Sequence, residues 1–216
     1  MAAVFDALAG RYDEWYERPF GRSAFAAEVA CLRRVLPPFR RGLEVGVGTG
    51  RFASALGIGT GLDPSRAELV IARSRAVEPV QGVGEALPFR SESFDLVLIV
   101  VTLCFVDDPA RVLAESARVL VPGGSVVLGL IVRESPWADF YLKKARAGHP
   151  IYRLARFYAY REVLGLLGAA GFKAGPVAST LLEEPQDTAP IRSGQVHDGF
   201  QPAAGFTCLR AVRRPS

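Results

Sequence analysis

The segment Leu43–Gly50, with the sequence L-E-V-G-V-G-T-G, constrains the fold of this chain more than any other. The residues from Gly42 to Val45 read as a buried strand, and a helix is expected to begin near Arg51. Glycines 46, 48 and 50 permit a sharp turn and a close approach of other groups to the backbone. Such a turn leaves N–H groups of the helix N-terminus free for an anionic or strongly polar ligand. The segment therefore predicts a strand, a glycine loop and a helix around a ligand site.

Two carboxylates flank the glycine loop. Glu44 precedes its first glycine, and Asp63 closes the next predicted strand in the sequence G-L-D-P. A carboxylate at the tip of that second strand can accept hydrogen bonds from both hydroxyls of a ribose. Taken alone, the glycines could also form a tight turn that binds no ligand. The two acids favour the interpretation that the loop binds a nucleoside. The dinucleotide fingerprint G-x-G-x-x-G is not met, because Arg51 stands at its third glycine.

Length and composition exclude several classes of protein. The 216 residues, half of them hydrophobic, suit one α/β domain with a large core. No apolar run approaches the ~20 residues of a membrane span, and the first residues lack the pattern of a signal peptide, so a cytoplasmic location is expected. The few cysteines and histidines match neither a disulfide framework nor a metal site; they are Cys31, Cys104, Cys208, His149 and His197.

The formal net charge of +4 raises the question of a nucleic-acid partner. The arginines are scattered along the chain, and no basic stripe with interleaved aromatic residues is present. An arginine-biased, solvated surface is the better interpretation, and no nucleic-acid partner is expected.

Residues 1–37 predict two amphipathic helices with a break near Pro19–Gly21. The first helix is expected to place Leu8, Tyr12, Trp15 and Tyr16 on one face, at helical spacing. The second is expected from Ser23 to Leu36, where two prolines end it.

From Gly42 onward the pattern alternates between strands and helices. The strands are expected over 42–46, 58–62, 77–82, 93–101 and 125–132, and the helices over 51–56, 64–75 and 107–120, with Pro64 as a first helical residue. This rhythm predicts a parallel sheet with right-handed crossovers. The aromatic-rich segment 133–161 interrupts the rhythm and is expected at the carboxyl end of the sheet, where ligands bind. A helix over 161–170 and strands over 173–182 and 205–213 follow.

Taken together, five segments resemble the class I S-adenosylmethionine-dependent methyltransferases, in the small-molecule branch with L-P-F and R-V-L-x-P-G-G signatures. They are Leu43–Gly50, Gly61–Pro64, Glu85–Phe89, Phe94–Val101 and Arg118–Gly124. The resemblance implies an α/β, Rossmann-like sheet of seven strands in the order 3-2-1-4-5-7-6, with strand 7 antiparallel and helices on both faces. We accordingly expect a single methyltransferase domain over 1–216, with an N-terminal helical cap over 1–37 and a lid insertion over 133–161.

The resemblance also implies where S-adenosylmethionine binds and S-adenosylhomocysteine forms. Glu44 and the loop residues Gly46, Val47 and Gly48 would hold the methionine portion, and Tyr12 would close over its carboxylate. Asp63, followed by Pro64, would bind the ribose hydroxyls. Gly84, Glu85 and Ala86 would lie beside the adenine, and carbonyls around Val101 and Thr102 would receive the ammonium group.

One position departs from the family pattern. Many relatives carry an acid for the adenine amino group two positions before Glu85, where this chain has Val83. Either Glu85 substitutes for that acid, or the adenine is held by stacking and backbone contacts.

Methyl transfer from a sulfonium requires that the acceptor atom is aligned with the methyl group and that water is excluded. Some acceptors also need a base that removes a proton from them. No base common to the family is expected, so acceptor-side candidates are sought in the cap and the lid. His149 is a candidate base because the usual pKa of histidine lies near neutral pH. Tyr16 and Tyr158 can face a sulfonium, and Arg156 can bind an anionic acceptor. For each of these residues a structural role is the alternative. The expected partner is a small-molecule acceptor. Its identity and the atom that is methylated stay open, and so does the oligomeric state of the protein.

Two other functions remain as alternatives. An NAD(P)-binding oxidoreductase of related fold is disfavoured by Arg51 and by the lack of a Tyr-x-x-x-Lys sequence. A non-catalytic module that binds S-adenosylmethionine stays possible because a fold does not fix a reaction.

Overall fold

The computed structural model describes residues 2–215, in which strands and helices alternate after two N-terminal helices. The N-terminal helices are α1 (Ala2–Trp15) and α2 (Pro19–Val35). The alternating part comprises β1 (Gly42–Val45), α3 (Arg51–Leu56), β2 (Thr60–Asp63), α4 (Arg66–Ser74), β3 (Glu78–Gln81), β4 (Phe94–Val100), α5 (Pro109–Val119) and β5 (Leu120–Leu130). The chain continues with α6 (Pro136–Arg146), the short 3-10 helix η1 (Tyr152–Leu154), α7 (Tyr160–Ala169), β6 (Phe172–Thr180), β7 (His197–Asp198) and β8 (Phe206–Arg213).

The strands form one sheet in the order β3-β2-β1-β4-β5-β8-β6-β7. The strands from β1 to β5 pair in parallel, whereas β8 runs antiparallel between β5 and β6. This arrangement confirms the predicted order, with β8 as the antiparallel strand. The two-residue β7, which pairs with β6 at the sheet edge, was not predicted.

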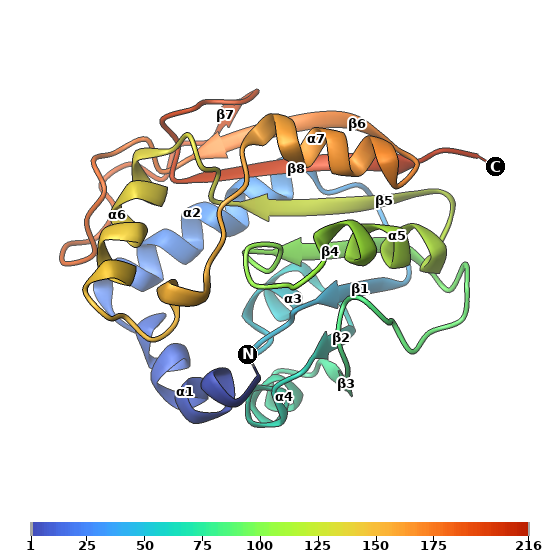
Figure 1. The fold of residues 1–216 in the computed structure, drawn as a ribbon, viewed down its shortest axis with the longest axis horizontal. Helices are drawn as coiled ribbons and strands as arrows, with labels where there is room; N and C mark the ends of the chain where they lie inside the picture. Colours follow the sequence, from blue (N-terminus) through green and yellow to red (C-terminus); the bar gives the residue numbers. More distant parts are fainter. Residues whose placement is uncertain (1, 216) are drawn as a thin grey trace.

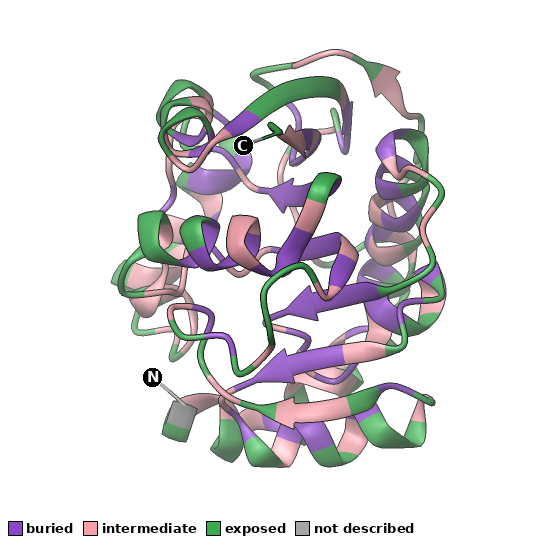
Figure 2. Cartoon of the chain, turned by 90° about the vertical axis from the view of Figure 1, so that its right-hand side faces the viewer, coloured by how far each residue is buried: buried purple, intermediate pink, exposed green. Residues whose placement is uncertain are grey.

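The central strand β4 is buried on both faces of the sheet, as its unbroken apolar sequence requires. Alternate side chains point to opposite faces: Leu96 and Leu98 pack in a core with residues of α2 and α3, whereas Val97 and Ile99 pack with residues of α5 and α7. Figure 2 shows the strands in the middle largely buried and the outer helix surfaces exposed.

The carboxyl ends of the parallel strands face one end of the molecule. In Figure 1, β1, β4 and β5 point to the left, and α1 and α6 lie beyond that end of the sheet. The helix α1 packs beside α4. The predicted cap and lid segments therefore both contribute helices to the end where ligands of such sheets bind.

Several predicted boundaries are wrong, for local reasons. The helix α2 begins at Pro19 rather than Ser23, because a proline is well suited to the first helical turn. Pro64 precedes its helix instead of opening it: Ser65 is the N-cap, and its hydroxyl accepts a 3.2 Å hydrogen bond from the N–H of Glu68. The helix α6 within the lid segment was not predicted.

The two signature sequences are joined by hydrogen bonds. The Arg118 guanidinium donates to the carbonyl oxygens of Leu87 (2.9 Å) and Phe89 (2.8 Å). The carboxylate of Glu115 accepts from the N–H of Leu87 at 2.9 Å and from Arg118. The arginine thus fixes the loop between β3 and β4 onto α5, which gives the L-P-F and R-V-L-x-P-G-G segments a structural role.

Among residues 2–215, no helix combines the length and the apolar character that a bilayer crossing requires.

Candidate active site

A cavity of about 450 Å³ lies over the glycine loop at the carboxyl end of the sheet. Its volume falls within the range of about 300–1,000 Å³ that is usual for small-molecule sites. The lining comes from the glycine loop, α1, α2, α6 and the segment around η1. Of the residues expected in the site, those that line this cavity are Tyr12, Tyr16, Glu44, Gly46, Val47, Gly48, Val101 and His149.

The glycine loop has a backbone that residues with side chains rarely adopt. Gly46, Gly48 and Gly50 have φ values of 74°, 51° and 79°, in the left-handed region. At Gly46 space is also lacking, because a Cβ there would lie 2.2 Å from Cγ2 of Thr102. Thr102, which was expected beside the cofactor, packs against this glycine and donates a 2.9 Å hydrogen bond to the carbonyl of Val100.

Glu44 is the buried acid of the cavity wall. The residue is 1% exposed, and within residues 2–215 its Oε2 finds no hydrogen-bond partner. Burial, aided by the charge of Asp63, raises the pKa of Glu44 well above its usual value. A buried carboxylate oxygen without a partner is costly unless a ligand supplies one. The orphaned oxygen therefore fits a donor group of a ligand, such as the ammonium of a methionine portion.

Asp63 binds the glycine loop from the end of β2. Its carboxylate accepts a 2.9 Å hydrogen bond from the N–H of Gly48 and a 2.8 Å bond from the N–H of Ser65. Burial raises the pKa of Asp63, and these two hydrogen bonds partly offset that rise. The neighbouring Glu68, which was not predicted, is also buried, and burial followed by the charge of Asp63 raises its pKa to about 8.

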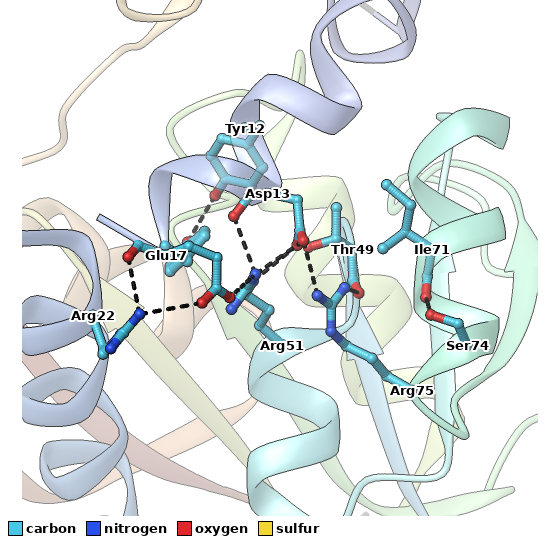
Figure 3. A network of polar contacts seen from close by, with 10 residues as sticks. Tyr12, Asp13, Glu17, Arg22, Thr49, Arg51, Ile71, Ser74 and Arg75 are labelled. Carbon is cyan, nitrogen blue, oxygen red and sulfur yellow. Dashed lines mark hydrogen bonds and ion pairs between the residues drawn. The ribbon is translucent and has the colours of Figure 1, made fainter. Parts of the chain in front are cut away.

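A network of ion pairs fastens α1 to the glycine-loop side of the cavity (Figure 3). The carboxylate of Asp13 pairs with Arg51 at 2.8 Å and with Arg75 at 2.9 Å, and Arg51 also pairs with Glu17 at 2.7 Å. Burial raises the pKa of Asp13, but the hydrogen bonds from both arginines outweigh it and leave that pKa well below its ordinary value. Arg51, at the place of the fingerprint's third glycine, thus positions the helical cap.

Four tyrosines line the part of the cavity between the cap and α6: Tyr12, Tyr16, Tyr141 and Tyr152. The hydroxyls of Tyr12 and Tyr16 share a 3.0 Å hydrogen bond, and the rings of Tyr141 and Tyr152 lie 4.5 Å apart. Burial raises the pKa of every one of these phenols, so all four remain neutral near neutral pH.

His149 lies in the cavity wall with one ring nitrogen engaged. Its Nδ1 accepts from the backbone N–H groups of Ile151 and Tyr152, at 3.4 Å each, and its ring lies 4.3 Å from that of Tyr152. Burial, and then the charge of Lys144, lowers the pKa of His149. With Nδ1 as an acceptor, the proton of the neutral ring is on Nε2, which makes the outer nitrogen a donor.

The remaining predicted residues do not line this cavity: Asp63, Pro64, Gly84, Glu85, Ala86, Thr102, Arg156 and Tyr158. The Glu85 carboxylate accepts from the N–H groups of Asp107 (3.1 Å) and Asp108 (3.3 Å) at the start of α5. Tyr158 lines a separate small hollow, and the exposed Arg156 lies 5.1 Å over its ring. The part of the chain that the structure describes contains no group of three His, Cys, Asp or Glu side chains suited to a metal ion.

Several charged residues of the cavity were not predicted as site residues: Arg11, Arg18, Glu28, Arg51, Lys144 and Asp187. Lys144 and Asp187 form an ion pair with each other. The sequence held a signal for Glu28, which follows Phe25 by three positions and precedes Leu32 by four, so that it lies on the apolar side of its helix. No comparable pattern marks Lys144 or Asp187.

Comparisons with known proteins decide the family. A family described as "Methyltransferase domain" matches residues 43–128. The crystal structure of a SAM-dependent methyltransferase from Thermotoga maritima, described as a possible histamine N-methyltransferase, is 35% identical, with a TM-score of 0.90 over 99% of both chains. The chain belongs to the S-adenosylmethionine-dependent methyltransferases. That membership confirms the predicted enzyme class and decides against the NAD(P)-binding oxidoreductase.

Two further relatives of this methyltransferase differ in how much of the chain they match. An uncharacterized protein of Mycobacterium tuberculosis is 47% identical over 212 residues, which are 98% of this chain and 73% of the relative. A phosphatidylethanolamine N-methyltransferase of Cereibacter sphaeroides is 33% identical over 137 residues, or 57% of this chain and 67% of that protein.

Proposed function

We propose that this methyltransferase binds S-adenosylmethionine over the glycine loop and transfers its methyl group to a small-molecule acceptor in the same cavity. The observation that carries the proposal is the buried, unpaired oxygen of Glu44 in the wall of a cavity of about 450 Å³. The left-handed glycines beside it expose the backbone to a ligand.

When bound, S-adenosylmethionine supplies a methyl group that the adjacent positive sulfur activates for displacement. We propose that Glu44 and residues 46–48 hold its methionine portion together with Tyr12, and that Asp63 and Pro64 lie toward the ribose. The Glu85 carboxylate is engaged by the N–H groups of Asp107 and Asp108, just before α5. The adenine is therefore proposed to rest on stacking and backbone contacts near Gly84 and Ala86.

The residues on the acceptor side align the substrate and exclude water. Tyr16 and the other cavity tyrosines present aromatic faces, which attract a sulfonium or another cation. His149 offers a hydrogen-bond donor rather than a base, because its other nitrogen is occupied. Arg156 and Tyr158 are not proposed to touch the acceptor.

The names of two relatives bear on the acceptor. The Cereibacter protein is described as an N-methyltransferase and the Thermotoga protein as a possible one, so a nitrogen is the first atom to test. We also propose that residues 1–216 act as one domain and that the chain works in the cytoplasm. The three free thiols, Cys31, Cys104 and Cys208, suit a reducing compartment.

The function is tested by methyl transfer into fractionated cell extract. The full chain is incubated with S-adenosylmethionine labelled on its methyl group and, separately, with small-molecule, protein and nucleic-acid fractions. We expect label in the small-molecule fraction. Label only in the protein or nucleic-acid fraction would refute a small acceptor, and cofactor binding without transfer into any fraction would favour a non-catalytic module.

A further inference from the structure

Glu28 is an acidic residue of the cavity for which the described part of the chain supplies no hydrogen-bond or ion-pair partner. It lies on α2 and lines the same cavity as Glu44. Burial raises the pKa of Glu28 to about 8 and is the one cause of that shift, since no hydrogen bond or ion pair from elsewhere in residues 2–215 offsets it. A carboxylate in such surroundings is costly unless a cation pairs with it.

Lys144, Asp187 and Arg51 of the cavity are already paired, whereas Arg11 and Arg18, which also line it, are exposed and form no ion pair within residues 2–215. Lys144 binds Asp187, and Arg51 binds Asp13 and Glu17. None of these cations is joined to Glu28 by an ion pair within the described chain. Within residues 2–215 Glu28 is therefore paired with no cation, and a cationic ligand in the cavity can supply one.

Aromatic side chains line the same cavity as this acid. Tyr12, Tyr16, Tyr141 and Tyr152 and Glu28 all line this one cavity of about 450 Å³. A carboxylate beside several aromatic faces is the combination that binds an organic ammonium group, because the acid pairs with the charge and the rings attract the cation. It is poorly suited to an anionic acceptor, which the acid would repel.

We propose that Glu28 recognises the methyl acceptor, and that this acceptor is a small cationic amine whose ammonium group binds between Glu28 and the tyrosines. The proposal rests on the function proposed above and specifies its substrate class. Glu28 is thereby a specificity-determining residue, distinct from Glu44, which is proposed to serve the methyl donor. A neutral alcohol of the same shape leaves the acid without a cation and binds more weakly.

The test measures binding rather than turnover. Isothermal titration calorimetry is performed on the full chain saturated with S-adenosylhomocysteine, which cannot donate a methyl group. The probes are histamine, 2-phenylethylamine and spermidine, each compared with a neutral or anionic counterpart such as 2-phenylethanol or phenylacetate. The variants are Glu28→Gln, which keeps the size of the side chain, and Glu78→Gln, a control on an exposed glutamate of β3.

We expect at least one amine to bind the wild type and the control, and to lose about tenfold or more in affinity in Glu28→Gln. The affinity for S-adenosylhomocysteine stays unchanged in both variants, which shows that Glu28→Gln is folded. Equal amine binding by Glu28→Gln, or equal binding of the neutral or anionic counterparts by the wild type, would overturn the proposal. If no amine binds the S-adenosylhomocysteine complex, the amine class fails while the proposed function stands; if S-adenosylhomocysteine itself does not bind, both fail.

Discussion

The carboxylate of Asp63 accepts a 2.9 Å hydrogen bond from the backbone N–H of Gly48, which ties the end of β2 to the glycine loop. Its other oxygen accepts from the N–H of Ser65 at 2.8 Å. One acid thus orders both the loop that lines the cavity and the start of α4.

Asp63→Asn is expected to weaken this junction. The N–H groups of Gly48 and Ser65 each bind a separate oxygen of Asp63, and the amide of asparagine has only one acceptor oxygen. The free energy of unfolding should fall by about 1–3 kcal/mol, and the affinity for S-adenosylhomocysteine should fall about tenfold or more. Urea unfolding and calorimetry measure the two effects, with the exposed Asp139→Asn as control. Unchanged values for Asp63→Asn would contradict this role.

Asp13 is expected to make the stability depend on pH. Its pKa in the folded chain lies well below its ordinary value, so its contribution is fully present above the unfolded pKa of about 3.9 and is lost as the pH falls below it. Asp13→Asn should cost about 1–2 kcal/mol at neutral pH. The difference from wild type should shrink in acid, and it is followed by urea unfolding from pH 7 downward. Glu14→Gln, an exposed neighbour in α1, serves as control; a difference independent of pH would count against the ion pairs.

Gly46→Ala is expected to destabilise the fold by about 3 kcal/mol, because the backbone is left-handed and the added Cβ meets Thr102 at 2.2 Å. Gly59→Ala is the matched control, since within residues 2–215 no atom beyond the adjoining residues lies within 4 Å of a Cβ there. Its effect should stay within about 0.5 kcal/mol. Equal melting temperatures for the two variants would show that the loop tolerates a side chain at Gly46.

Arg118→Lys is expected to loosen the loop between β3 and β4, because lysine cannot reproduce the forked donation to Leu87 and Phe89. A loss of about 1–3 kcal/mol in the free energy of unfolding is predicted. Arg90→Lys, at an exposed position of the same loop, provides the comparison. Hydrogen exchange should show faster exchange at the N–H of Leu87 in Arg118→Lys alone; identical exchange in both variants would refute the role.

The alternating part of the fold was predictable because each of its elements has a clear periodicity. The helix α3 was predicted to the residue, and the strand order was confirmed. The start of α4 was missed because the Asp63 carboxylate accepts a hydrogen bond from the N–H of Ser65. Ser65 then caps the helix through the N–H of Glu68, so the helix begins after Pro64. The helix α6 was missed because the segment 133–161 was predicted only as an aromatic-rich lid insertion, although Ser135 caps the helix and buried Trp137 anchors it.

The candidate site was predictable where a residue belongs to a contiguous segment. Glu44 and the glycine loop follow directly from one strand and line the cavity as a group. Glu28, Lys144 and Asp187 reach the cavity from three separate elements, so only the tertiary fold brings them together. For Glu85 the sequence showed a turn beside the predicted adenine site, but not that the N–H groups just before α5 would engage its carboxylate.

The central claim is that the cavity over the glycine loop binds the methyl donor through Glu44. Titration of the full chain with S-adenosylhomocysteine in a calorimeter tests it most directly, with wild type and Glu44→Gln side by side and NADH as a competing ligand. The account predicts saturable one-site binding to the wild type, an affinity about tenfold or more lower for Glu44→Gln, and no binding of NADH. Equal binding by the variant, or binding of NADH in place of S-adenosylhomocysteine, would contradict it.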